Sequence, residues 1–152
     1  MTGTPKQSVA PPLAGVHVLD LADERGIYGS KLLADLCAST IRIESIHEDG
    51  LRQRGPFNQA GESLWYAYYA SNRVVIKIDL KSDHGITQLK KLVSKADIII
   101  DTGILNSITS TGFDLNDLNS EVVHVDVSSF GQDGPWKDFL APDLIAGALG
   151  GS

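Results

Sequence analysis

Four aspartates in this 152-residue chain lie near the ends of short runs of apolar, mostly β-branched residues: Asp20, Asp79, Asp101 and Asp126. Such runs are typical of strands, and in an open parallel sheet ligands bind beyond the carboxyl ends of the strands. Carboxylates gathered there could hold Mg²⁺, which suggests a receiver-like phosphotransfer domain. The alternative is that each carboxylate caps the turn or helix that follows it, and residue type alone favours this second interpretation.

A basic side chain lies at the exit of one of these runs. In the segment VVIKIDLK, strand alternation places Lys77, Asp79 and Lys81 on one side and the aliphatic residues on the other. An ammonium group at a strand exit can contact a phosphate. Lys81 is therefore a candidate phosphate contact, and the alternative is an ordinary solvated lysine.

Several common catalytic motifs are absent from the sequence. The loop after the first apolar run, residues 22–29, contains Gly26 and Gly29 but no G-x-G-x-x-G. There is also no G-x-x-x-x-G-K-[ST], no Cys/His metal spacing and no G-x-S-x-G. The sequence therefore gives no support for a nicotinamide enzyme, a P-loop enzyme, a zinc site or an α/β-hydrolase. No catalytic residue or metal ligand is assigned.

The segments that must position these residues alternate between two periodicities. Short β-branched runs alternate with longer stretches of helical spacing, which predicts strand–helix–strand units, an α/β fold and a mostly parallel sheet. The predicted strands are residues 16–21, 40–46, 74–80, 96–101 and 121–129. Helices are predicted over residues 29–38, in an aromatic segment after Ser63, after a cap at Ser82, at 114–118 and from Pro142 onward.

Composition limits the class of protein. With 42% hydrophobic residues, the chain has enough apolar material for the core of one ordinary domain. A net charge of −6 argues against a nucleic-acid partner, because phosphate binding needs clustered Lys and Arg. The only cysteine, Cys37, cannot form an internal disulfide and is interpreted as a small buried hydrophobe on the first helix.

The sequence also bears on location. It contains no apolar run of about 18 residues, and its first residues lack the hydrophobic segment of a signal peptide. We therefore expect a cytoplasmic protein without a membrane partner. Residues 1–11 are predicted to be a flexible leader, and residues 12–152 to be the folded portion.

Six segments in order resemble a known family: PLAGVHVLDL, YGSKLLADLCASTIRIES, NRVVIKIDLKS, ADIIID, SEVVHVDVSSFGQDGPW and DLIAGALGG. Together, from Pro12 to Ser152, they resemble the N-terminal portion of the family III CoA-transferases, the group of carnitine and formyl-CoA transferases. The resemblance implies a Rossmann-like, three-layer domain whose substrate is coenzyme A or acyl-CoA, with no permanently bound cofactor. It also implies a homo-oligomer, an interlocked dimer in complete family members.

The family moves CoA between carboxylic acids through anhydride and thioester intermediates on an aspartate. The resemblance places that aspartate beyond Ser152, so this chain by itself is predicted to be inactive. Residue by residue, Lys81 matches a lysine that contacts CoA and Ile78 an apolar neighbour of that lysine. Arg25 and Gly26 occupy the loop that faces the thioester, where Glu24 or Arg25 stands in for a family glutamine.

Some positions depart from the family pattern. The usual Glu-Asn-Phe after the fourth strand reads Asp101, Thr102 and Gly103, and a family arginine is replaced by Ser110. Thr102 thus occupies a CoA-binding position with a different side chain, and Ser45 replaces a residue that is basic in some members. These departures suggest one alternative, an inactive CoA-transferase-like binding module. The aspartates near the strand ends suggest the other, the magnesium-dependent receiver-like domain.

Overall fold

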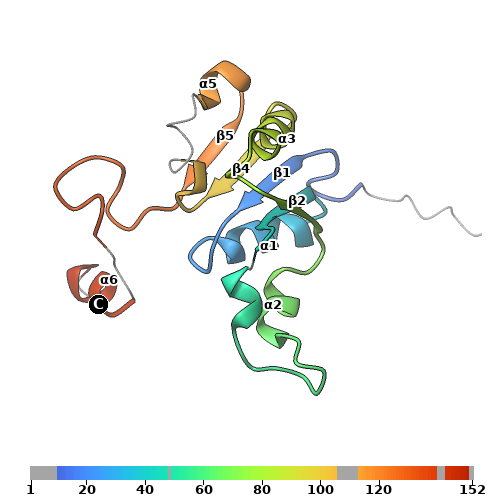
Figure 1. The fold of residues 1–152 in the computed structure, drawn as a ribbon, viewed down its shortest axis with the longest axis vertical. Helices are drawn as coiled ribbons and strands as arrows, with labels where there is room; N and C mark the ends of the chain where they lie inside the picture. The colour runs from blue at the N-terminus through green and yellow to red at the C-terminus, as the bar shows by residue number, and fades with distance from the viewer. Residues whose placement is uncertain (1–9, 48, 106–112, 140–142, 151–152) are drawn as a thin grey trace, which may run out of the picture.

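A computed structural model describes residues 10–47, 49–105, 113–139 and 143–150. Its centre is one five-stranded parallel sheet in the order β3-β2-β1-β4-β5 (Figure 1). The strands are β1 (His17–Leu21), β2 (Ser39–Ser45), β3 (Val74–Ile78), β4 (Ile98–Asp101) and β5 (Val123–Asp126). The helices are α1 (Ile27–Asp35), η1 (Gly50–Gln53), α2 (Leu64–Tyr69), α3 (Asp83–Val93), α5 (Leu115–Leu118) and α6 (Asp143–Gly150). The prediction of an α/β fold with a parallel sheet is confirmed.

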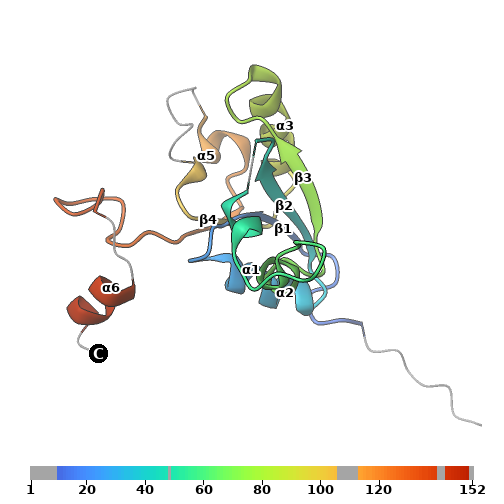
Figure 2. The same cartoon turned by 60° about the horizontal axis from the view of Figure 1, so that its bottom comes forward.

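The strand order changes direction at β1. The chain adds β2 and then β3 on one side of β1, and β4 and β5 on the other. This is the Rossmann-like order, in which ligands bind where the direction reverses. Helices α1 and α2 cover one face of the sheet and α3 and α5 the other, as the two views show (Figures 1 and 2).

The main core lies between the sheet and α3. It contains Leu19 and Leu21 of β1, Ile99 of β4, and Leu89 and Val93 of α3, all almost fully buried. Strand β1 is buried along nearly its whole length because helices cover both faces. The predicted cap of α3 is confirmed, since the Ser82 hydroxyl oxygen accepts a hydrogen bond from the Gly85 N–H at 3.1 Å.

The prediction for Cys37 is wrong. Helix α1 ends at Asp35, and Cys37 lies in the turn beyond it, exposed, with φ of +71°. Its N–H donates to the Ala34 carbonyl and the Ala38 N–H to the Leu33 carbonyl, which is the Schellman pattern of a helix C-terminus. The turn ends the helix before Cys37 can join its buried face.

Three predictions fall on residues outside the described ranges. They concern the leader at residues 1–9, Ser110, and Pro142 as the start of the last helix. Within the described ranges, no helix has the length and apolar character needed to span a membrane.

Candidate functional site

The four aspartates do not gather at one point. Leu21 and Asp101 are register partners on β1 and β4 and share the α3 face, whereas Asp20 pairs with Ile100 and faces α1. Asp20 and Asp101 therefore lie on opposite faces of the sheet. The magnesium-site hypothesis built on all four carboxylates is wrong, because alternation along the paired strands β1 and β4 separates Asp20 from Asp101.

The capping interpretation agrees with the contacts. One Asp20 oxygen accepts from the Ala22 N–H at 3.0 Å, and one Asp79 oxygen accepts from the Lys81 N–H at 3.0 Å. Asp101 accepts from three successive N–H groups, those of residues 103, 104 and 105. Burial raises the pKa of Asp101, and these backbone hydrogen bonds oppose the rise.

Asp101 also belongs to a small cluster on the α3 face. Ligand atoms of Asp101, His124 and Asp126 lie within 4.8 Å of one another. The His124 Nε2 atom is 3.9 Å from the Asp101 carboxylate, and Gln132 donates to Asp126. The cap after β4 and these side-chain contacts account for the cluster.

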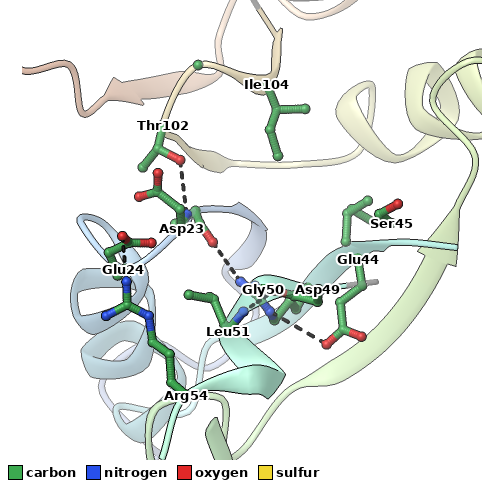
Figure 3. Close-up of a pocket in the computed structure, with 14 residues that line it drawn as sticks. Asp23, Glu24, Glu44, Ser45, Asp49, Gly50, Leu51, Arg54, Thr102 and Ile104 are labelled. Atoms are coloured by element: carbon green, nitrogen blue, oxygen red, sulfur yellow. Dashed lines mark hydrogen bonds and ion pairs between the residues drawn. The ribbon is translucent and has the colours of Figure 1, made fainter. Parts of the chain in front are cut away.

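A pocket of about 470 Å³ opens at the carboxyl ends of β1, β2 and β4 (Figure 3). This is the point where the strand order reverses, the expected ligand crevice of the fold. Its walls come from the β1–α1 loop, the end of β2, the η1 region and the loop after β4. The lining residues are Ala22, Asp23, Glu24, Arg42, Ile43, Glu44, Ser45, Asp49, Gly50, Leu51, Arg54, Thr102, Gly103 and Ile104.

The loops after β1 and β4 are joined directly at this pocket. The Asp23 N–H donates to the Thr102 hydroxyl at 2.9 Å, and the Arg25 guanidinium donates to the Thr102 carbonyl at 2.7 Å. A Cβ at Gly26 would lie 3.1 Å from the Thr102 methyl group and 2.9 Å from the Ala22 Cβ, so a glycine permits this approach. Three of the predicted binding residues, Arg25, Gly26 and Thr102, are thus in one contact group.

The neighbouring residues Glu24 and Arg25 have different positions relative to the pocket. Arg25 binds the Asp23 carboxylate with Nε at 3.0 Å and Nη2 at 2.7 Å, beside Thr102. Glu24, and not Arg25, is among the residues that line the pocket. The side chain that faces the cavity from this loop is therefore acidic.

The other two predicted residues, Ile78 and Lys81, line a second hollow of about 140 Å³ beside the end of β3. It shares Ile43, Glu44, Ser45 and Ile104 with the larger pocket. The two hollows therefore adjoin at the carboxyl ends of the strands. Of the five predicted residues, Arg25, Gly26 and Thr102 lie at one end of the joined hollows, and Ile78 and Lys81 lie at the other.

A buried ion-pair network lies beneath the pocket and was missed by the sequence reasoning. Asp20 is 0% exposed and contacts the guanidinium groups of Arg42, at 3.3 Å, and Arg73. Arg42 also donates to the Ala22 carbonyl at 2.9 Å and to Asp49 at 2.8 Å. It therefore ties the β1–α1 loop to the η1 region, two walls of the pocket.

Two polar positions in β2 explain why the network was missed. Arg42 and Glu44 alternate with isoleucines in the segment TIRIES, the pattern of a strand with one solvated face. In the structure both side chains are buried, Arg42 against Asp49 at the start of η1, and Glu44 against Arg52 of η1 and Tyr66 of α2. A signal was present, because a parallel central strand covered on both faces must pair any charge that it carries.

Glu44 is held by two residues above it. Arg52 donates to Glu44 through Nε at 2.9 Å and Nη2 at 3.0 Å, and the Tyr66 hydroxyl donates to the same carboxylate. The Arg52 guanidinium lies 4.1 Å from the Tyr66 ring centroid. Burial, reinforced by the hydrogen bond to Glu44, raises the pKa of Tyr66 to about 12.

The raised pKa predicts a loss of stability at high pH. Tyr66 in the unfolded chain ionises near pH 10, and in the folded protein near pH 12. Its contribution is fully present below pH 10 and decreases as pH rises toward 12, because the unfolded state then binds fewer protons. We expect Tyr66→Phe to lose stability less steeply than the parent protein over this range, measured by urea unfolding.

Spectroscopic titration supplies the control. Tyrosinate absorbance should show the late ionisation of Tyr66 in the parent protein, and this component should be missing in Tyr66→Phe. Parallel stability curves for the two proteins between pH 10 and 12 would contradict the prediction.

Comparison with known proteins agrees with this architecture. The family model described as CoA-transferase family III matches residues 13–152. A succinate–glutarate CoA-transferase of Agrobacterium fabrum is 35% identical over 162 residues, covering 99% of this chain and 40% of the relative. An acetyl-CoA:oxalate CoA-transferase of Acetobacter aceti is 30% identical over 156 residues, with coverage of 99% and 40%. The chain spans about two-fifths of the length of these relatives.

Solved structures give the same result. A CAIB/BAIF family protein from Brucella suis is 27% identical with a TM-score of 0.79, over 92% of this chain and 39% of that one. A hypothetical protein from Mycobacterium tuberculosis has a TM-score of 0.81 at 22% identity, over 93% and 40%, which shows the shared fold. From the match over residues 13–152, this chain belongs to CoA-transferase family III.

Proposed function

We propose that this chain is the N-terminal, CoA-binding portion of an enzyme that moves CoA between carboxylic acids. The observation that supports this most directly is the pair of adjoining hollows at the switch point of the sheet. One end carries the Arg25–Gly26–Thr102 contact group, and the other carries Lys81. Together they form one site that extends from the β1–α1 loop to the turn after β3, which suits a nucleotide with an extended arm.

The chemistry of the two ends assigns a direction to CoA. Lys81 is exposed at the end of β3, where its ammonium group can bind a phosphate of the nucleotide. Ile43, Ile78 and Ile104 give the middle of the site an apolar wall for the pantetheine arm. The thioester then lies in the larger pocket, near Glu24 and Thr102.

The proposed reaction needs a nucleophilic carboxylate, which we place beyond Ser152. The four carboxylates that line the pocket are each in an ion pair: Asp23 with Arg25, Glu24 with Arg54, Asp49 with Arg42, and Glu44 with Arg52. The attacking aspartate would bond to the thioester carbonyl carbon as the C–S bond breaks, giving an anhydride and CoA thiolate. Attack of the thiolate on the aspartyl carbonyl would release the first acid, and the acceptor acid would then take the CoA by the reverse steps.

Calorimetric titration with CoA tests the binding proposal. We expect micromolar binding by the parent chain and about ten-fold weaker binding by Lys81→Ala, since one charge-assisted contact to phosphate is lost. Lys95→Ala is the matched control, because Lys95 lies at the opposite edge of the sheet, beside the start of β1. Its affinity should equal that of the parent.

Two outcomes would count against the proposal. No detectable heat with CoA would favour the alternative, a family scaffold that has lost CoA binding. Steady acyl transfer by the 152-residue chain alone would contradict the placement of the nucleophile beyond Ser152.

A further inference from the structure

An exposed ion pair spans two walls of the larger pocket. Glu24 lies in the β1–α1 loop, and Arg54 is the C-cap residue of η1. Both side chains line the pocket. The Arg54 Nη2 atom donates to a Glu24 carboxylate oxygen at 2.7 Å (Figure 3). The side chain of Arg54 is 45% exposed and that of Glu24 is 44% exposed, so both groups are accessible to solvent.

Arg54 differs from the other arginine that lines this pocket. The Arg42 side chain is only 3% exposed, and its guanidinium is held by Asp20, Asp49 and the Ala22 carbonyl. Arg54 makes a side-chain hydrogen bond to Glu24, and its guanidinium lies 5.4 Å from the Trp65 ring centroid. An arginine carries five N–H donors, so Arg54 has the donors to bind a ligand carboxylate in place of Glu24.

The Glu24–Arg54 pair can open at low cost. Exposed ion pairs contribute little to stability, because water solvates both partners when they separate. Glu24 accepts one hydrogen bond from the Arg54 Nη2 atom, whereas a guanidinium can bind a carboxylate in a planar, bidentate geometry, which an incoming carboxylate can adopt. The pair is therefore suited to exchange a protein carboxylate for one on a ligand.

We propose that Arg54 binds a free carboxylate at the far end of the acyl group, and that Glu24 competes for the same guanidinium. The acyl donors or acceptors of this site are then dicarboxylic acids. This inference rests on the proposed function, which places the thioester in the larger pocket. Arg54 is in this view a specificity-determining residue, and it takes no part in bond making.

The test compares two acyl-CoA analogues that differ only in this carboxylate. Succinyl-CoA and butyryl-CoA analogues, each with a methylene group in place of the thioester sulfur, are titrated into the purified protein. We expect the succinyl analogue to bind about ten-fold more tightly. In Arg54→Gln this ratio should fall to about one, whereas Lys91→Gln, which removes an equal charge from exposed helix α3, should keep it.

The reciprocal variant separates ligand binding from a structural role. Glu24→Gln removes the carboxylate that competes for Arg54. The succinyl analogue should therefore bind this variant about three-fold more tightly than it binds the parent protein. A purely structural ion pair would weaken binding when broken from either side. Opposite effects of the two variants therefore support the proposal, and weakening by both would overturn it.

The remaining outcomes also decide between the two proposals. Equal affinity for the two analogues in the parent protein would overturn the inference and leave CoA binding intact. If Arg54→Gln bound neither analogue, Arg54 would be a structural support of the pocket wall, and the inference would also be overturned. Failure of the parent to bind either analogue, or CoA itself, would overturn the proposed function first.

Discussion

Replacing Asp20 with Asn should lower the free energy of unfolding by about 3–5 kcal/mol, because it leaves buried positive charge uncompensated. Asp20 is the shared partner of Arg42 and Arg73, and the side chains of all three are buried. Arg73 also donates to the Ser30 hydroxyl at 2.9 Å and the Ile27 carbonyl at 3.1 Å, so it cannot easily turn toward water. Asparagine keeps the shape of aspartate, but it removes the charge and replaces one of the two acceptor oxygens with an N–H donor.

Urea unfolding followed by circular dichroism measures this effect. Asp23→Asn is the control, since Asp23 forms a partly exposed pair with Arg25 and should lose less than about 1 kcal/mol. Equal, small losses in both variants would show that water reaches the two arginines beneath the pocket. A loss of the expected size is a large part of the stability of an ordinary domain.

Replacing Gly85 with Ala should cost about 2 kcal/mol, although alanine is the better helix former. A Cβ at Gly85 would lie 1.9 Å from the Asp79 carbonyl oxygen and 3.0 Å from an Ile78 methyl group. The first turn of α3 packs directly on the backbone that leaves β3. The helix would have to move away from the sheet, and overpacking of this kind outweighs the gain in helix propensity.

Gly50→Ala provides the comparison, because a Cβ there has open space around it. Its free energy of unfolding should be unchanged or slightly raised. The shift in Gly85→Ala should also disturb Lys81, whose N–H donates to Asp79 at the same turn, so CoA affinity should fall together with stability. A fully stable Gly85→Ala protein would contradict this account of the β3–α3 turn.

Local patterns were enough to predict the strands of this protein and most of its helices, although not η1. β-Branched runs located the five strands to within a few residues at either end, and Ser82 marked the start of α3. These signals are local, because period and capping depend on neighbours within one or two turns of the chain. The order of six segments then indicated the family, which the match over residues 13–152 shows.

Alternation within one strand, in contrast, could not identify what lies on either face. It made Arg42 and Glu44 resemble solvent-facing residues, and it could not show that Asp20 and Asp101 lie on opposite faces. Those facts depend on the register between β1 and β4 and on helices packed from elsewhere in the chain. Pairing between strands depends on contacts between residues far apart in the sequence, so a pattern within one strand cannot predict it.

The candidate site divides in the same way. Residue order by itself determined the α/β class, the positions of the loops after β1 and β4, and Lys81 at the exit of β3. Only the tertiary structure decided that Glu24 rather than Arg25 lines the pocket, and that Arg54 meets it from a loop 30 residues away. The physical reason is that a pocket at strand ends is built from loops whose contacts are fixed by sheet order, and sheet order emerges only when the whole core packs.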